Sequence, residues 1–119
     1  MRFEVRPTEA ALEDVNVIRR WIAEHGAPLN AERWVERLLV TLTKLEAHPT
    51  RCRLAPEDED IEEAEVRQLL FGRFRILFTV SGKQVLILHV RHGSRRYATR
   101  EELAQALEEL EREEGEQET

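Results

Sequence analysis

The stretch EVRQLLFGRFRILFTVSGKQVLILHVRHGSRR, residues 65–96, decides the fold of this chain. It holds three runs rich in β-branched and aromatic residues, which predict three strands. These runs span residues 66–71, 74–80 and 84–91. Gly72 separates the first two runs, and Ser81-Gly82-Lys83 supplies a tight turn between the last two. The stretch therefore predicts a meander of antiparallel strands.

Upstream of the meander, two amphipathic patterns predict a pair of helices. Apolar residues recur at three- and four-residue steps over residues 9–24 and again over residues 31–47. Thr8 and Asn30 are the predicted N-caps. The short link between the patterns makes the helices an antiparallel hairpin. The tryptophans of this region, Trp21 and Trp34, are both predicted to pack in the core between hairpin and sheet.

These elements give an α+β fold of order β-α-α-β-β-β, an antiparallel sheet with the helical hairpin packed on one face. Its first strand comes from residues 2–6, where apolar and charged residues alternate. Residues 49–64 are predicted to form a surface loop. A further helix is predicted over residues 100–113, since Thr99 with Glu102 fits a capping box.

Strict alternation divides the side chains of the meander into two faces, if the turn after Val80 has two residues. One face is nearly all apolar and is predicted to bury against the helices; it comprises Phe74, Ile76, Phe78, Val80, Val85, Ile87 and His89. His89 is expected to be a buried histidine with satisfied ring nitrogens. The other face mixes basic and apolar groups; it comprises Arg73, Arg75, Leu77, Thr79, Leu86, Leu88, Val90 and His92.

The mixed face is expected to be wet, or to be covered by something acidic and amphipathic. Burying an unpaired cation costs several kcal/mol, so two arginines along one strand are not expected in an apolar core. Arg73 and Arg75 are read either as outward residues paired with the acidic loop or as a surface for partners. Arg91 falls with His89 by strict alternation, so only a bend after Val90 would turn it to this face.

Charge is distributed in blocks, although the formal net charge is −6. Residues 57–65 hold seven acids and no base, residues 66–100 hold eight bases and no acid, and residues 101–119 hold nine acids against one arginine. A polyanion responds to the local field of the basic block rather than to the average charge. The C-terminal acidic helix is hypothesised to pack on or near the basic face, and the alternative is an ordinary surface helix.

Several classes of protein are excluded by the composition. Cys52 is the single cysteine, so neither a disulfide framework nor a cysteine zinc site is expected, and the histidine spacing predicts no metal. No cofactor is expected. No apolar run reaches the roughly 20 residues that a bilayer requires, and the N-terminus does not read as a signal peptide. The expected location is the cytoplasm, with no membrane partner.

Three ordered pieces of the sequence resemble the C-terminal sheet of the RelE/ParE superfamily of toxins. They are Glu65-Val66-Arg67-Gln68-Leu69, Phe74-Arg75-Ile76-Leu77-Phe78, and His89-Val90-Arg91-His92 through Arg95-Arg96. The resemblance covers about residues 2–97 and favours the ParE-like, plasmid-stabilisation branch. It implies a toxin-like domain over residues 1–97, followed by an acidic helix and frayed tail over residues 98–119. It also implies a cognate antitoxin as partner.

The resemblance leaves two targets open. A ParE-like toxin would act on DNA gyrase, whereas a RelE-like toxin would cut mRNA in the ribosome without metal. The candidate catalytic residues of the second reading are Arg73, Arg91, His92 and Tyr97. The residues expected to bind a partner or nucleic acid are Arg67, Arg73, Arg75, Arg91, Arg95 and Arg96. A third reading is an inactive toxin-like domain that only binds a partner, and both a homodimer and a toxin–antitoxin hetero-oligomer fit the sequence.

Overall fold

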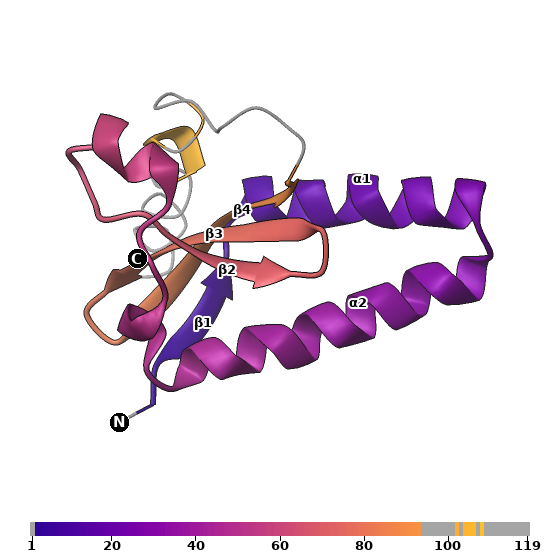
Figure 1. Ribbon diagram of the computed structural model, residues 1–119, viewed down its shortest axis with the longest axis horizontal. Helices are drawn as coiled ribbons and strands as arrows, with labels where there is room; N and C mark the ends of the chain where they lie inside the picture. The colour runs from indigo at the N-terminus through magenta and orange to yellow at the C-terminus, as the bar shows by residue number, and fades with distance from the viewer. Residues whose placement is uncertain (1, 94–101, 103, 107, 109–119) are drawn as a thin grey trace, which may run out of the picture.

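The computed structural model describes residues 2–93, 102, 104–106 and 108, and shows a four-stranded sheet beside a helical hairpin (Figure 1). The strands and long helices of these residues follow the predicted order. They are β1 (Glu4–Pro7), α1 (Glu9–His25), α2 (Pro28–Thr43), β2 (Arg67–Phe71), β3 (Phe74–Ser81) and β4 (Gln84–His92). Among the described residues, no helix is long and apolar enough to cross a membrane. The predicted α+β class and element order are confirmed.

The sheet has the order β1-β4-β3-β2. Strands β2, β3 and β4 form the predicted antiparallel meander, with Gly72 and Gly82 at positive φ in its two turns. Strand β1 instead pairs parallel to β4, so the sheet is mixed rather than wholly antiparallel. The helical hairpin and strands β2 and β3 lie between these two strands in the chain, and such a long connection permits parallel pairing.

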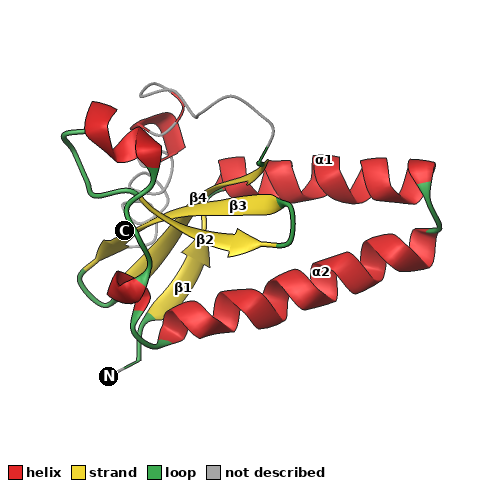
Figure 2. Ribbon diagram, viewed as in Figure 1, coloured by secondary structure: helices red, strands yellow, loops and turns green. Residues whose placement is uncertain are grey.

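The helical hairpin begins at the predicted cap and differs at its second helix. The Thr8 side chain accepts a hydrogen bond from the Ala11 N–H at 3.1 Å and donates to the Ile87 carbonyl at 2.9 Å, which ties the start of α1 to β4. Helix α2 begins at Pro28, not after Asn30, because proline fits the first helical position. The helices run antiparallel beside the sheet (Figure 2).

The main core fills the space between the hairpin and the sheet. Its buried members are Ala11, Trp34, Leu38, Leu45, Ile76, Phe78, Val85, Ile87 and Val90. The prediction for Trp34 is confirmed, with 6% of its surface exposed. The prediction for Trp21 is wrong, because 60% of its surface is exposed. Trp21 lies one residue before Ile22, and on a helix one residue turns the side chain about 100° away from the buried stripe.

An irregularity in β4 changes which side chains face the hairpin. Leu77 pairs with His89 whereas Phe78 pairs with Ile87, so Leu88 is an extra residue on β4. Ile87 and Val90 consequently both join the main core. His89 and Arg91 turn to the opposite side of the sheet, called the outer face below. The predicted place of His89 on the hairpin face is therefore wrong, and so is the predicted place of Val90 and His92 on the opposite face. The bend that turns Arg91 to the outer face lies before Val90, not after it.

The outer face is covered by a second apolar cluster. The cluster comprises Ala55, Ile61, Val66, Leu77, Leu88 and Ala106. Ala55, Ile61 and Val66 contribute to this cover, and Ala55 and Ile61 flank the short 3₁₀ helix Pro56–Asp60; a second short 3₁₀ helix of this region, Pro49–Arg51, adds no member to the cluster. The Asp58 carboxylate accepts a hydrogen bond from the Val66 N–H at 2.7 Å, which closes the segment onto the start of β2. This region is thus a packed layer in part, and not only the predicted surface loop.

Candidate functional site

A buried ion pair joins the basic block to the acidic block that precedes it. The Arg75 guanidinium donates to both carboxylate oxygens of Glu57, at 2.6 and 3.1 Å, and to the Gln68 Oε1 at 3.0 and 3.1 Å. Arg75 is 7% exposed and Glu57 is 2% exposed. The two-pronged geometry satisfies the planar cation in a dry setting. One of the two interpretations of Arg75 was that it pairs with the acidic loop. The structure shows this pairing, with Glu57 as the partner.

A second ion pair connects β4 to the acidic C-terminal region. The Arg91 guanidinium donates to the Glu102 carboxylate, and Arg91 is 3% exposed. Residues 102, 104–106 and 108 are helical, and Ala106 is fully buried in the outer-face cluster. These described residues therefore lie on the outer face; the rest of the predicted 100–113 helix falls outside the described residues.

A histidine and an aspartate form a third polar contact, at the edge of β4. The His89 Nδ1 lies 2.8 Å from Asp14 Oδ2, and the same oxygen accepts a hydrogen bond from the Val90 N–H at 3.0 Å. The carboxylate makes Nδ1 the protonated ring nitrogen. The His89 Nε2 is buried with no hydrogen-bond partner among the described residues, so the expectation of satisfied ring nitrogens holds for Nδ1 alone. Sequence reasoning missed Asp14, because a single aspartate on an amphipathic helix gives no signal of a partner 75 residues away.

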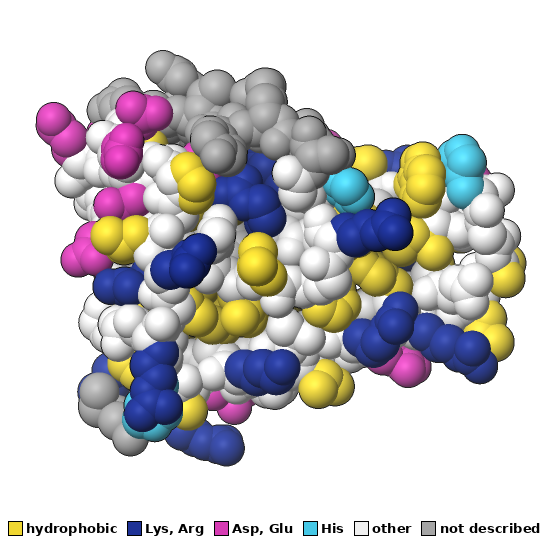
Figure 3. Space-filling view, in the orientation of Figure 1, with side chains coloured by type: hydrophobic (Ala, Val, Ile, Leu, Met, Phe, Trp, Pro, Cys, Tyr) yellow, Lys and Arg dark blue, Asp and Glu magenta, His cyan; other side chains and the backbone are white. Residues whose placement is uncertain are grey.

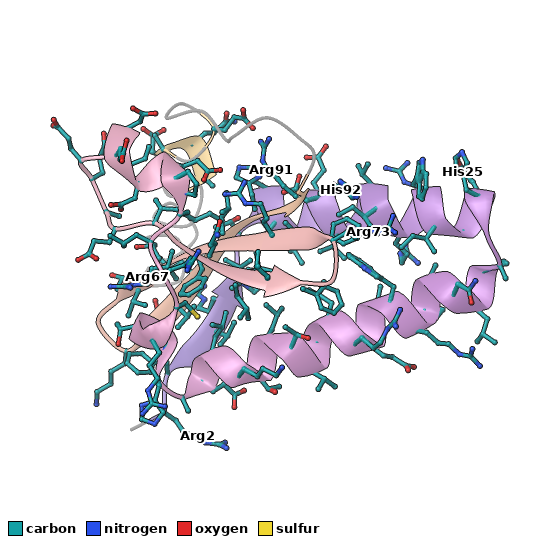
Figure 4. All side chains as sticks on the ribbon, viewed as in Figure 1. Arg2, His25, Arg67, Arg73, Arg91 and His92 are labelled. Carbon is teal, nitrogen blue, oxygen red and sulfur yellow. The ribbon has the colours of Figure 1, made fainter. Side chains whose placement is uncertain are left out.

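A groove of about 810 Å³ runs between α1 and the adjoining ends of β3 and β4. We call it the α1 groove, and its lining residues are Glu13, Asp14, Val17, Ile18, Trp21, Ile22, Arg73, Phe74, Val90 and His92. The His92 ring packs edge-on against Phe74, with centroids 5.4 Å apart. Figure 4 labels His92 and Arg73, the histidine and the arginine that line the groove. In the same view, Figure 3 shows a histidine and a cationic side chain beside apolar side chains over α1. The groove is therefore an apolar trough with charged walls.

The predicted site residues separate into different environments. Arg73 and His92 both line the α1 groove, whereas Arg91 is buried on the outer face. Arg67 lies elsewhere, with its guanidinium 3.1 Å from a Glu65 carboxylate oxygen and 2.7 Å from the Cys52 carbonyl (Figure 4). The remaining predicted residues, Arg95, Arg96 and Tyr97, lie outside the described residues. The described part of the chain thus does not bring Arg91 together with Arg73 and His92.

Neither a metal centre nor a reactive thiol emerges from the described residues. Within them, no group of three His, Cys, Asp or Glu side chains could hold a metal ion. Burial raises the pKa of the Cys52 thiol, an effect that the nearby Arg67 opposes. A thiol of raised pKa is protonated at neutral pH and is a poor nucleophile.

Comparison with known proteins assigns the family. Residues 5–97 match the family described as the ParE toxin of the type II toxin-antitoxin system, parDE, and the chain belongs to it. Its fold is similar to a solved structure described as the chromosomal ParDE TA system from P. aeruginosa, with a TM-score of 0.64 and 22% identity. That match covers 76% of this chain and 96% of the other. No curated protein matches this chain.

Proposed function

We propose that this protein inhibits bacterial growth by acting on DNA gyrase in the cytoplasm, and that a cognate antitoxin neutralises it. Membership of the ParE toxin family supports the proposal, as does similarity to a solved ParDE toxin–antitoxin system. The observation that carries it against RNA cleavage is the separation of Arg91 from Arg73 and His92. Metal-independent RNA cleavage needs a base, an acid and a phosphate-binding cation around one scissile bond.

The test is inducible expression in a bacterium, together with an assay on purified gyrase. We expect growth arrest with an SOS response, and loss of supercoiling activity or accumulation of cleaved DNA when the purified chain meets gyrase. Co-expression with the cognate antitoxin should restore growth. Growth arrest together with unchanged gyrase activity would contradict the proposal that gyrase is the target.

A ribosome-dependent mRNA endonuclease is the second candidate, and one observation favours it. Arg73 and His92 share the α1 groove, so a cation and a group able to exchange protons lie within one site. In this reading, mRNA cuts positioned by codon would appear within minutes of induction, and Arg73→Ala or His92→Ala would abolish them. Gyrase-linked DNA breaks without such cuts would exclude it.

An inactive partner-binding domain is the third candidate, favoured by the burial of Arg75 and Arg91 with carboxylates. Expression would then leave growth unchanged while the chain still binds an antitoxin. Size-exclusion chromatography with light scattering, run with and without antitoxin, distinguishes a homodimer from a toxin–antitoxin hetero-oligomer.

A role in binding partners stays a prediction for five arginines, which are Arg67, Arg75, Arg91, Arg95 and Arg96.

A further inference from the structure

Six basic side chains belong to one end of the sheet, where β1, β2 and β4 begin and β3 ends. Arg2 precedes β1, Arg67 is the first residue of β2, and Lys83 lies in the turn between β3 and β4. The segment between α2 and β2 supplies the other three. We call this surface the basic end, and its members are Arg2, Lys44, Arg51, Arg53, Arg67 and Lys83.

Hydrogen bonds fix the segment of residues 44–53 against the start of β2. The Arg67 guanidinium donates to the Thr50 carbonyl at 3.2 Å and to the Cys52 carbonyl at 2.7 Å. The Gln68 N–H donates to the Arg53 carbonyl at 3.0 Å. The two arginines on either side of Cys52 are therefore held beside the strand that carries Arg67.

The same segment is also fixed to β1, and β1 is fixed to the turn between β3 and β4. The Phe3 N–H donates to the Glu46 carbonyl at 2.8 Å, and the Glu4 N–H donates to the Lys83 carbonyl at 2.9 Å. Figure 3 shows dark blue side chains gathered at this end of the molecule, where Figure 4 labels Arg2 and Arg67. The basic end is thus assembled from parts of the chain that are far apart in sequence.

Most cations of the basic end have no carboxylate to neutralise them. Arg2 lies 3.7 Å from a Glu46 carboxylate oxygen, and Arg67 lies 3.1 Å from one of Glu65. Within the part of the chain that the structure describes, no ion pair engages the other four, which are Lys44, Arg51, Arg53 and Lys83. All four are exposed. Positive charge is therefore concentrated here, on a chain whose formal net charge is −6.

The width of the basic end suits a nucleic-acid duplex. The sheet has four strands, and neighbouring strands lie about 4.8 Å apart, so the cations are spread over roughly 14 Å. The grooves of B-form DNA are about 6 and 12 Å wide, so cations at this spacing reach phosphates on both sides of a groove. Single exposed cations are ordinarily solvated, whereas basic side chains clustered on one face are the footprint of nucleic-acid binding.

We propose that the basic end binds the phosphate backbone of duplex DNA without reading its sequence. This inference goes beyond the proposed function, because it assigns a direct contact between this chain and DNA. A toxin that acts on gyrase works beside DNA, so the contact would add to its affinity for the complex of gyrase with DNA.

The first test measures binding of the purified chain to a fluorescently labelled DNA duplex of about 20 base pairs by anisotropy, between about 50 and 200 mM salt. If the four unpaired cations each neutralise one phosphate, the affinity should fall by about 150-fold over that range. Duplexes of two unrelated sequences should bind equally, because phosphate contacts carry no sequence information. Absence of salt-dependent binding at the lowest salt would overturn the inference.

The second test reverses cations from different parts of the basic end. Arg51→Glu combined with Arg53→Glu should weaken binding by about tenfold or more at low salt and reduce the salt slope by about two. Lys44→Glu combined with Lys83→Glu should have the same effect. Thermal unfolding of each variant checks that the fold is retained.

The matched control changes the net charge by the same amount elsewhere. Arg20→Glu combined with Arg33→Glu alters exposed positions of α1 and α2, and it should change the affinity by less than about threefold, since salt screens distant charges. Equal weakening by the control would show that net charge alone governs binding. Weakening by the Arg51 and Arg53 changes alone would reduce the site to one loop. Either result would overturn the inference.

A competition experiment distinguishes DNA from RNA. Unlabelled duplex DNA should displace the labelled duplex at lower concentration than duplex RNA of the same sequence, and the reverse order would overturn the assignment to DNA. These measurements contain neither gyrase nor antitoxin. A failure here therefore leaves the proposed function standing, and a failure of the gyrase assay leaves the contact with DNA standing.

Discussion

Arg75 and Arg91 lie opposite each other on β3 and β4, and their guanidinium groups reach carboxylates from two different segments. Glu57 comes from the 3₁₀ helix Pro56–Asp60 before β2, and Glu102 comes from the described helical residues near the C-terminus. Like charges directly across a strand pair repel each other. Separate carboxylates allow both arginines to be buried in one sheet. The outer face is therefore a junction of the basic block with the two acidic blocks that flank it in sequence.

Removing the Glu57 carboxylate should destabilise the protein strongly. Glu57→Ala leaves the buried Arg75 without its main counter-charge, a loss of about 3–5 kcal/mol in the free energy of unfolding. Urea titration followed by circular dichroism measures this value. Glu59→Ala, at an exposed position of the same segment, should change it by less than about 0.5 kcal/mol. Equal effects from the two changes would show that the pair contributes little.

Removing the Glu102 carboxylate should have a smaller effect, because 28% of that side chain is exposed. We expect Glu102→Gln to lower the free energy of unfolding by about 1.5–3 kcal/mol, the range of one hydrogen bond to a charged group. The matched control is Glu108→Gln, at an exposed helical position. A loss that appears for both variants would point to a general charge effect rather than to the contact with Arg91.

The Asp14 carboxylate should fix the state of the His89 ring. Asp14→Ala removes the acceptor for His89 Nδ1 and for the Val90 N–H, with an expected loss of about 1–3 kcal/mol in stability. Nitrogen-15 NMR of the imidazole should show Nδ1 protonated in the unaltered chain and a shifted tautomer balance in the variant. Glu13→Ala, one residue earlier and exposed, should leave the imidazole spectrum unchanged.

The Cys52 thiol should react slowly with alkylating reagents, and it should make the free energy of unfolding depend on pH in the alkaline range. Burial raises the pKa of this thiol above its ordinary value of 9.0, so the folded state holds the proton more tightly than the unfolded state. The resulting stabilisation is fully present below pH 9.0, the pKa of the thiol in the unfolded chain. It is lost as the pH rises through the higher pKa of the thiol in the folded chain. Iodoacetamide at pH 8 should react more slowly with the native than with the denatured chain. Equal rates would contradict the shift, and Cys52→Ser should remove this part of the alkaline dependence.

The local elements of the fold were predictable from sequence, because each rests on a short-range signal. Thr8 as a cap and the glycine turns of the meander are examples. The facing of side chains beyond Leu88 was not predictable, because a bulge depends on how two strands pair across the sheet. The pairing of Arg75 with the acidic loop was one of two readings of the sequence, whereas the partners of Arg91 and His89 could not be read from it. Their partners come from segments that only the folded chain brings together.

The contact between Asp14 and the Val90 N–H also bears on the open edge of the sheet. Strand β1 ends at Pro7 opposite Ile87, so among the described residues no strand pairs with the last part of β4 on the side away from β3. An open strand edge invites pairing with another molecule. By accepting the Val90 N–H, a carboxylate from α1 occupies a donor that an incoming strand would use, and it places a negative charge in that strand's path. The Asp14 side chain thus orients a histidine and also opposes the pairing of β4 with a strand of another molecule.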